Sequence, residues 1–61
     1  MLTNRQIVVI ANALWHRLGE TSIAAAMLRA QQAEAQGDDL RFADWRRVAM
    51  MLARFAEPKP A

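Results

Sequence analysis

Side chains that commonly act as catalysts are scarce in this chain. Its 61 residues include one serine, Ser22, one histidine, His16, and no cysteine or tyrosine. A nucleophile and its general base would therefore have to be Ser22 and His16, meeting across a turn at Gly19. Ser22 is more simply explained as a helix cap, since a hydroxyl from Thr21 or Ser22 suits the first position before a helix. We expect no enzymatic activity.

Ligands for a metal ion or a nucleotide are also too few. His16 and Glu20 are four residues apart, but Gly19 interrupts the helix that would align them, and a metal site usually needs three or four ligands. Gly37 lacks the glycine spacing of a phosphate-binding loop. Residues 38–39, both aspartate, suit the start of the next helix, where either acid can cap it and both face its positive end. We therefore predict neither a metal ion nor a cofactor.

Arginine and methionine side chains gather between residues 41 and 54. At helical spacing, three of these arginines and one methionine fall in a row with Asp44, and the others lie beside that row. Ion pairs of Asp44 with Arg47 and Arg41 on a solvated face would account for the arginines. They do not account for Met50 and Met51, which cannot both face the core together with their apolar neighbours. We expect at least one of the two methionines to be exposed.

An exposed methionine among arginines is typical of a protein interface, because methionine adapts its shape and arginine pairs with acids. We therefore predict a small, non-enzymatic helical protein-interaction module. It would be an adaptor, a regulator or a phage-type inhibitor of a larger complex, with a protein partner or with a second copy in a homo-oligomer. The candidate partner-binding residues are Arg41, Arg46, Arg47, Met50, Met51 and Arg54.

The alternative function is nucleic-acid binding, in which phosphates or guanine edges would be contacted by Arg41, Arg46, Arg47 and Arg54. The formal net charge of +2 gives this alternative little support. Recognition helices usually present their N-terminal residues to the bases, and here that end carries two acids. A protein partner is therefore the favoured prediction.

The composition is that of a folded chain, with 54% hydrophobic residues. The longest uncharged run, residues 6–16, is shorter than the roughly 18–20 apolar residues that cross a bilayer. The strictly apolar stretch 7–10 is also too short for the core of a signal peptide. The absence of cysteine fits a reducing compartment. We expect a cytoplasmic protein without membrane contact.

Helical spacing predicts an all-α fold, a compact three-helix domain with helices at about 4–18, 22–36 and 39–56. Thr3 and Gln6 form the capping-box pattern at the start of the first helix, and Gly19 and Gly37 mark the two turns. The inward faces are predicted to be Ile7, Ile10, Ala11, Leu14 and Leu18; then Ile23, Ala26, Met27, Ala30 and Ala33; then Phe42, Trp45, Val48, Ala49, Leu52, Phe55 and Ala56.

Residues 1–56 are predicted to form a single domain, and residues 57–61, with two prolines, a disordered tail. Short turns favour successive helices that run antiparallel. An alternative is a two-helix hairpin whose third helix completes the core of a dimer. Arginines recur every twelve residues from Arg5 to Arg41, but their flanking residues do not match, so we treat this spacing as coincidence.

Gly19-Glu20, Arg29, Gly37-Asp38 and Trp45, the last followed by "RRVA", together resemble a family of short alphaproteobacterial proteins of unknown function. The resemblance covers roughly residues 10–55 and depends on the shared spacing. The chain departs from the family at Leu18, where histidine is frequent, and at Arg41, where glycine is frequent. The resemblance implies an all-helical bacterial protein and names no activity.

Overall fold

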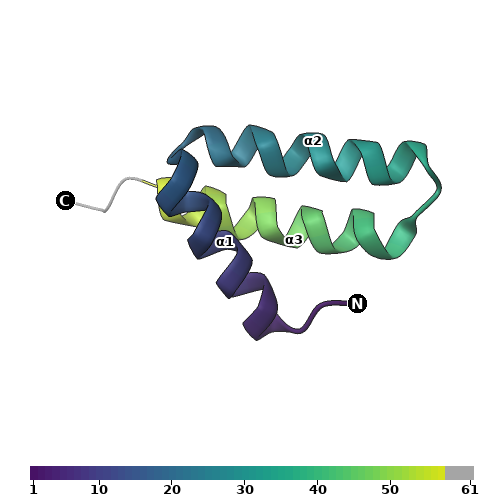
Figure 1. The fold of residues 1–61 in the computed structure, drawn as a ribbon, viewed down its shortest axis with the longest axis horizontal. Helices are drawn as coiled ribbons and strands as arrows, with labels where there is room; N and C mark the ends of the chain where they lie inside the picture. The colour runs from purple at the N-terminus through teal and green to yellow at the C-terminus, as the bar shows by residue number, and fades with distance from the viewer. Residues whose placement is uncertain (58–61) are drawn as a thin grey trace.

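The computed structural model describes residues 1–57 and contains three α-helices joined by two short turns (Figure 1). α1 spans Asn4–Leu18, α2 spans Thr21–Ala35 and α3 spans Asp39–Ala56. The predicted all-α three-helix class is confirmed, and only α2 departs from its predicted bounds, by one residue at each end. Of the predicted tail, residues 58–61 lie outside the described part of the chain.

α1 begins with the predicted capping box. The Thr3 hydroxyl accepts a hydrogen bond from the Gln6 backbone N–H at 3.2 Å, and the Gln6 side-chain oxygen accepts one from the Thr3 N–H at 2.8 Å. Two N–H groups that a helix start leaves without partners are thereby satisfied. The start of α1 is thus fixed by its own sequence.

The turn between α1 and α2 differs from the prediction. Thr21 and Ser22 do not cap α2, because Glu20 is its N-cap and already has helical dihedral angles (φ −63°, ψ −26°). Both hydroxyls donate backward instead, Thr21 Oγ1 to the Leu18 carbonyl at 2.6 Å and Ser22 Oγ to the Gly19 carbonyl at 2.5 Å. Both residues lie inside α2, where side chains point toward the N-terminus of the helix, so their hydroxyls meet the carbonyls three residues earlier.

The turn between α2 and α3 is the one the sequence predicts. Gly37 has φ 73°, its N–H donates to the Glu34 carbonyl at 3.0 Å, and the Asp38 N–H donates to the Ala33 carbonyl at 2.9 Å. This pair of bonds is the Schellman pattern that ends a helix at glycine. The Asp38 carboxylate then accepts from the Arg41 N–H at 3.1 Å and caps α3.

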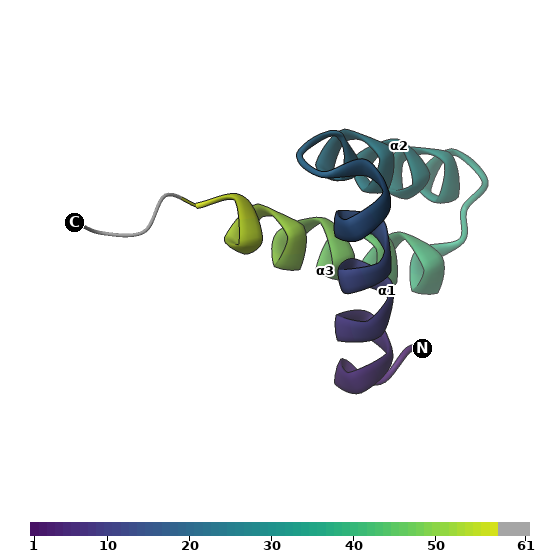
Figure 2. The same ribbon diagram turned by 60° about the vertical axis from the view of Figure 1, so that its left-hand side comes forward.

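α2 and α3 run antiparallel as a hairpin, and α1 lies across one side of it at a steep angle (Figures 1 and 2). The predicted antiparallel arrangement therefore holds for α2 and α3 but is wrong for α1 and α2. The physical reason lies at Gly19, whose dihedral angles of φ 59° and ψ −136° redirect the chain where a longer loop would let it fold back. Residues other than glycine rarely adopt this backbone conformation.

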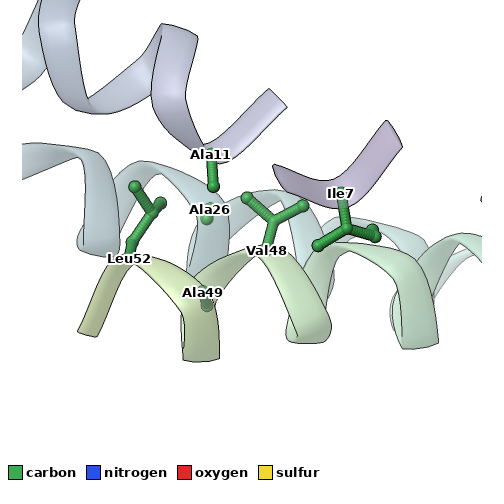
Figure 3. Close-up of a cluster of buried hydrophobic side chains, with 6 residues drawn as sticks. All are labelled: Ile7, Ala11, Ala26, Val48, Ala49 and Leu52. Atoms are coloured by element: carbon green, nitrogen blue, oxygen red, sulfur yellow. The ribbon is translucent and has the colours of Figure 1, made fainter. Parts of the chain in front are cut away.

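A small apolar core lies where α1 crosses the hairpin (Figure 3). Its buried members come from all three helices and are Ile7, Ala11, Ala26, Val48, Ala49 and Leu52. Partly buried side chains pack around them: Leu2, Ile10, Leu14, Trp15, Ile23, Trp45 and Met51. Both tryptophans thus support the core from its edge. Three predicted inward residues are wrong: Leu18, Met27 and Phe55 are exposed. Met27 is 53% exposed because α1 covers the other side of α2.

Candidate functional site

The hairpin has an open apolar groove along the junction of α2 and α3. The groove has a volume of about 360 Å³, and its walls come from both helices: Ile23, Met27, Ala30, Gln31, Phe42, Arg46, Ala49, Met50 and Ala53. Met27 and Met50 are 53% and 62% exposed. Arg46 is the single charged residue in this lining. We call this surface the α2–α3 groove.

The position of α1 explains why this surface stays open. On the side of α2 that is turned toward α1, Ala25 and Arg29 line a hollow together with residues of α1 such as Leu14. The groove residues of α2 lie on a different side of the same helix, and no residue of α1 lines the groove. With three helices, the chain covers one side of the hairpin and leaves the junction on the other side exposed.

The predicted partner-binding residues do not form one continuous face. Arg46 and Met50 line the α2–α3 groove. Arg47, Met51 and Arg54 line a smaller hollow of about 230 Å³ that they share with Met50 and with residues of α1. The remaining residue, Arg41, lies beside Trp45 at the opposite side of α3. The arginines therefore point to three different surfaces around the helix.

Arg47 and Asp44 hold the N-terminal segment against α3. Asp44 is 8% exposed, and its two carboxylate oxygens both accept from the Leu2 N–H at 3.2 Å. Arg47 donates to the Leu2 carbonyl at 2.9 Å and to the Asn4 side-chain oxygen, and lies 3.6 Å from Asp44. The predicted Asp44–Arg47 pair is confirmed, but it is largely removed from solvent and has a structural role. In residues 1–57 no Asp44–Arg41 ion pair accompanies it.

The two adjacent methionines divide as expected. Met50 is exposed, which confirms that at least one of them faces solvent. Met51 is half-buried and packs against the core cluster. A charge placed at Met51 would therefore disturb folding as well as binding. A substitution of Met50 tests binding at the α2–α3 groove without removing a core contact.

A second concave region, which the sequence did not reveal, surrounds Trp45. Arg17 and Arg29 line one hollow beside this indole, and Arg29 and Arg41 line another. These are three of the four arginines that recur every twelve residues. The helices bring them to one side of the molecule, although their flanking sequences share nothing. The sequence offered no signal for this region, because the three arginines are brought together by the crossing of α1 over the hairpin and not by their spacing along the chain.

The few side chains that could act in catalysis or bind a metal ion, Ser22 and His16, line neither of these regions. Ser22 is fully buried, and its hydroxyl is engaged by the Gly19 carbonyl. His16 is exposed in the last turn of α1, as expected. Within residues 1–57 no three histidine, aspartate or glutamate side chains are placed to share a metal ion. No helix in that range has the length and apolar character needed to cross a bilayer.

The comparisons with known proteins give no relative for this chain. No protein-family model matches it, and neither does any curated protein or solved structure. The resemblance to short alphaproteobacterial proteins stays a prediction, and the function has to be argued from the surfaces themselves.

Proposed function

We propose that this chain is a small, non-enzymatic protein-interaction module of the cytoplasm, which binds an amphipathic helix of a partner protein in the α2–α3 groove. The supporting observation is the open apolar junction between α2 and α3, with Met27 and Met50 more than half exposed on its walls. An adaptor or regulator of a larger complex would use such a surface to attach to one helix of that complex.

A helix is the occupant that the shape favours. The groove lies along two antiparallel helices, and a further helix placed there would complete a bundle around the hairpin. Small side chains, Ala30, Ala49 and Ala53, form part of the lining and permit a close approach. The flexible methionine side chains can adjust to the apolar residues of the incoming helix.

The charge at the groove favours a partner with an acidic residue over a second copy of this chain. A two-fold dimer places the same patch of each subunit against itself. Such a dimer would place both copies of Arg46 in one interface, while no acidic residue lines the groove to pair with them. A partner helix with a glutamate or aspartate beside its apolar stripe would pair with Arg46 instead.

Nucleic-acid binding by α3 draws less support. Such a helix would present its arginines to one groove of the duplex, whereas Arg41 and Arg46 line different surfaces and Arg47 is bonded to the N-terminal segment. The arrangement of these arginines therefore favours a protein partner over a nucleic acid.

Met50→Asp is expected to abolish binding of the partner without unfolding the protein. The matched control is Val9→Asp, because Val9 on α1 is also 62% exposed and does not line the α2–α3 groove. Tagged wild type and both variants are compared in nuclease-treated host lysate, and the recovered partner is identified and cut down to its binding segment. We expect at least a roughly tenfold loss of affinity for that segment with Met50→Asp, and little change with Val9→Asp.

Two results would contradict this proposal. If the binding segment has no amphipathic helix with an acidic residue, the assigned occupant is wrong. If light scattering finds a dimer of the wild type that Met50→Asp dissociates, the groove is covered by a second copy.

A further inference from the structure

The geometry points to a second site on the opposite side of the hairpin. We propose that the hollows around Trp45 bind a ligand that carries two or more neighbouring phosphate groups, contacted by Arg17, Arg29 and Arg41. This inference does not depend on the α2–α3 groove, since the two surfaces share no lining residue.

Each arginine comes from a different helix. Arg17 is in the last turn of α1, Arg29 is in the middle of α2 and Arg41 is in the first turn of α3. One hollow of about 210 Å³ contains Arg17 and Arg29, and the adjoining one of about 240 Å³ contains Arg29 and Arg41. Arg29 and Trp45 line both hollows, so the three arginines line one connected surface.

These three arginines have no acidic partner in residues 1–57, where the Arg47–Asp44 contact is the one ion pair within 4.0 Å. Two acids that share a hollow or a hydrogen bond with Arg41 have other partners for their carboxylates. Asp44 bonds the Leu2 N–H and contacts Arg47, and Asp38 caps α3. Three like charges are thus held on one side of a chain whose formal net charge is only +2. An anion would relieve their repulsion.

Trp45 orients the central arginine. The Arg29 guanidinium carbon lies 5.8 Å from the centre of the Trp45 ring, a cation–π contact. Stacking on one face leaves the N–H groups at the edge of the guanidinium able to donate, and that planar edge matches two oxygens of a phosphate. Gln32 and Gln36, which line the same hollow, add amide groups that can bond to a sugar or to further oxygens.

A surface lined by three arginines favours a ligand that carries several neighbouring negative charges. A single carboxylate or phosphate would occupy one hollow, whereas neighbouring phosphates could use both through the shared Arg29. Such phosphates occur in an oligophosphate, as in a nucleoside triphosphate, and in the backbone of a single nucleic-acid strand. The chemistry at the protein is the same for both sources.

Isothermal titration at low salt with three probes would test this site: inorganic tripolyphosphate, a nucleoside triphosphate and a short single-stranded oligonucleotide. The variant R17Q/R29Q/R41Q removes the three arginines. Its matched control, R5Q/R46Q/R54Q, removes three exposed arginines that do not line either hollow. Both variants change the formal net charge from +2 to −1, and circular dichroism verifies that each is folded.

We expect the wild type to bind at least one phosphate probe, and R17Q/R29Q/R41Q to lose at least about tenfold in affinity. R5Q/R46Q/R54Q should retain most of the affinity, and so should Met50→Asp, which separates this site from the α2–α3 groove. Comparison of the probes identifies the source, because a nucleic-acid strand would exceed tripolyphosphate in affinity if its backbone is the ligand.

Three outcomes would overturn the proposal. The first is that none of the phosphate probes binds the folded wild type. The second is an equal loss of affinity in the two triple variants, which would mean diffuse charge attraction without a site. The third is that a polyglutamate peptide binds at these arginines and the phosphate probes do not, which would assign the surface to an acidic protein segment.

Discussion

Asp44 shows how a single residue divides the arginines of α3 between structure and surface. Its carboxylate is nearly buried and holds both the Leu2 N–H and Arg47. The sequence predicted the pair with Arg47 from their spacing on one helix. It could not predict the bonds to Leu2 and Asn4, because these join residues more than forty positions apart and depend on how α1 crosses α3. The helical pattern therefore places Arg47 on a binding face, whereas in the structure it anchors the N-terminal segment.

Asp44→Ala is expected to lower the free energy of unfolding by about 1–3 kcal/mol, because it leaves the Leu2 N–H without its acceptor and removes the ion pair with Arg47. Asp39→Ala is the control, since Asp39 is exposed in the first turn of the same helix and contributes only about 0.3–1 kcal/mol through the helix dipole. Urea denaturation followed by circular dichroism measures both. Equal losses in the two variants would show that the Asp44 contacts do not stabilise the fold.

At the scale of the elements, the three helices were predictable and their packing was only partly so. The capping box at Thr3, the end of α2 at Gly37 and the cap at Asp38 each depend on residues within one or two turns of chain. The steep crossing of α1 depends on the backbone conformation of Gly19, which a sequence pattern does not specify beyond the presence of glycine. That crossing decides which side of the hairpin is covered, so it also decides where the open groove lies.

Gly19→Ala is expected to cost more stability than Gly37→Ala. Both glycines have positive φ, and a Cβ atom would meet no other atom within 4 Å at either position, so the cost arises from the backbone alone. At position 37, an alanine would have to adopt the left-handed conformation that is common at helix ends, which costs about 1–2 kcal/mol. The Gly19 angles, φ 59° and ψ −136°, lie outside the regions open to L-residues. Thermal unfolding of the two variants gives the order, and a larger loss at Gly37 would refute this account of the α1–α2 turn.

The whole molecule combines a small core with large exposed apolar surface. Six residues form the buried cluster, and three of them are alanine. A single core of this size supplies only about 3–5 kcal/mol of stability. Meanwhile Met27, Leu28, Leu40 and Met50 are each more than half exposed. A domain with this balance gains stability when a partner covers its apolar surface.

Leu52→Ala is expected to leave most of the isolated protein unfolded at 25 °C. Leu52 is fully buried at the centre of the core, and truncation of such a residue costs about 2–5 kcal/mol, similar to the stability of the whole domain. Far-UV circular dichroism measures the loss of helix. Full retention of the wild-type unfolding midpoint would show that the core is not where the structure places it. Saturating partner should restore folding, because binding to the native state adds stability.

The most direct test of the α2–α3 groove uses the chain's own four methionines as reporters. With their methyl groups labelled for NMR, the protein is titrated with the binding segment of its partner. Met27 and Met50 line the groove, whereas Met51 packs against the core and Met1 precedes α1. We expect large shifts of the Met27 and Met50 signals, with Met1 and Met51 changing far less. Shifts confined to Met1 and Met51, with Met27 and Met50 unmoved, would place the partner on another surface and contradict the proposed function.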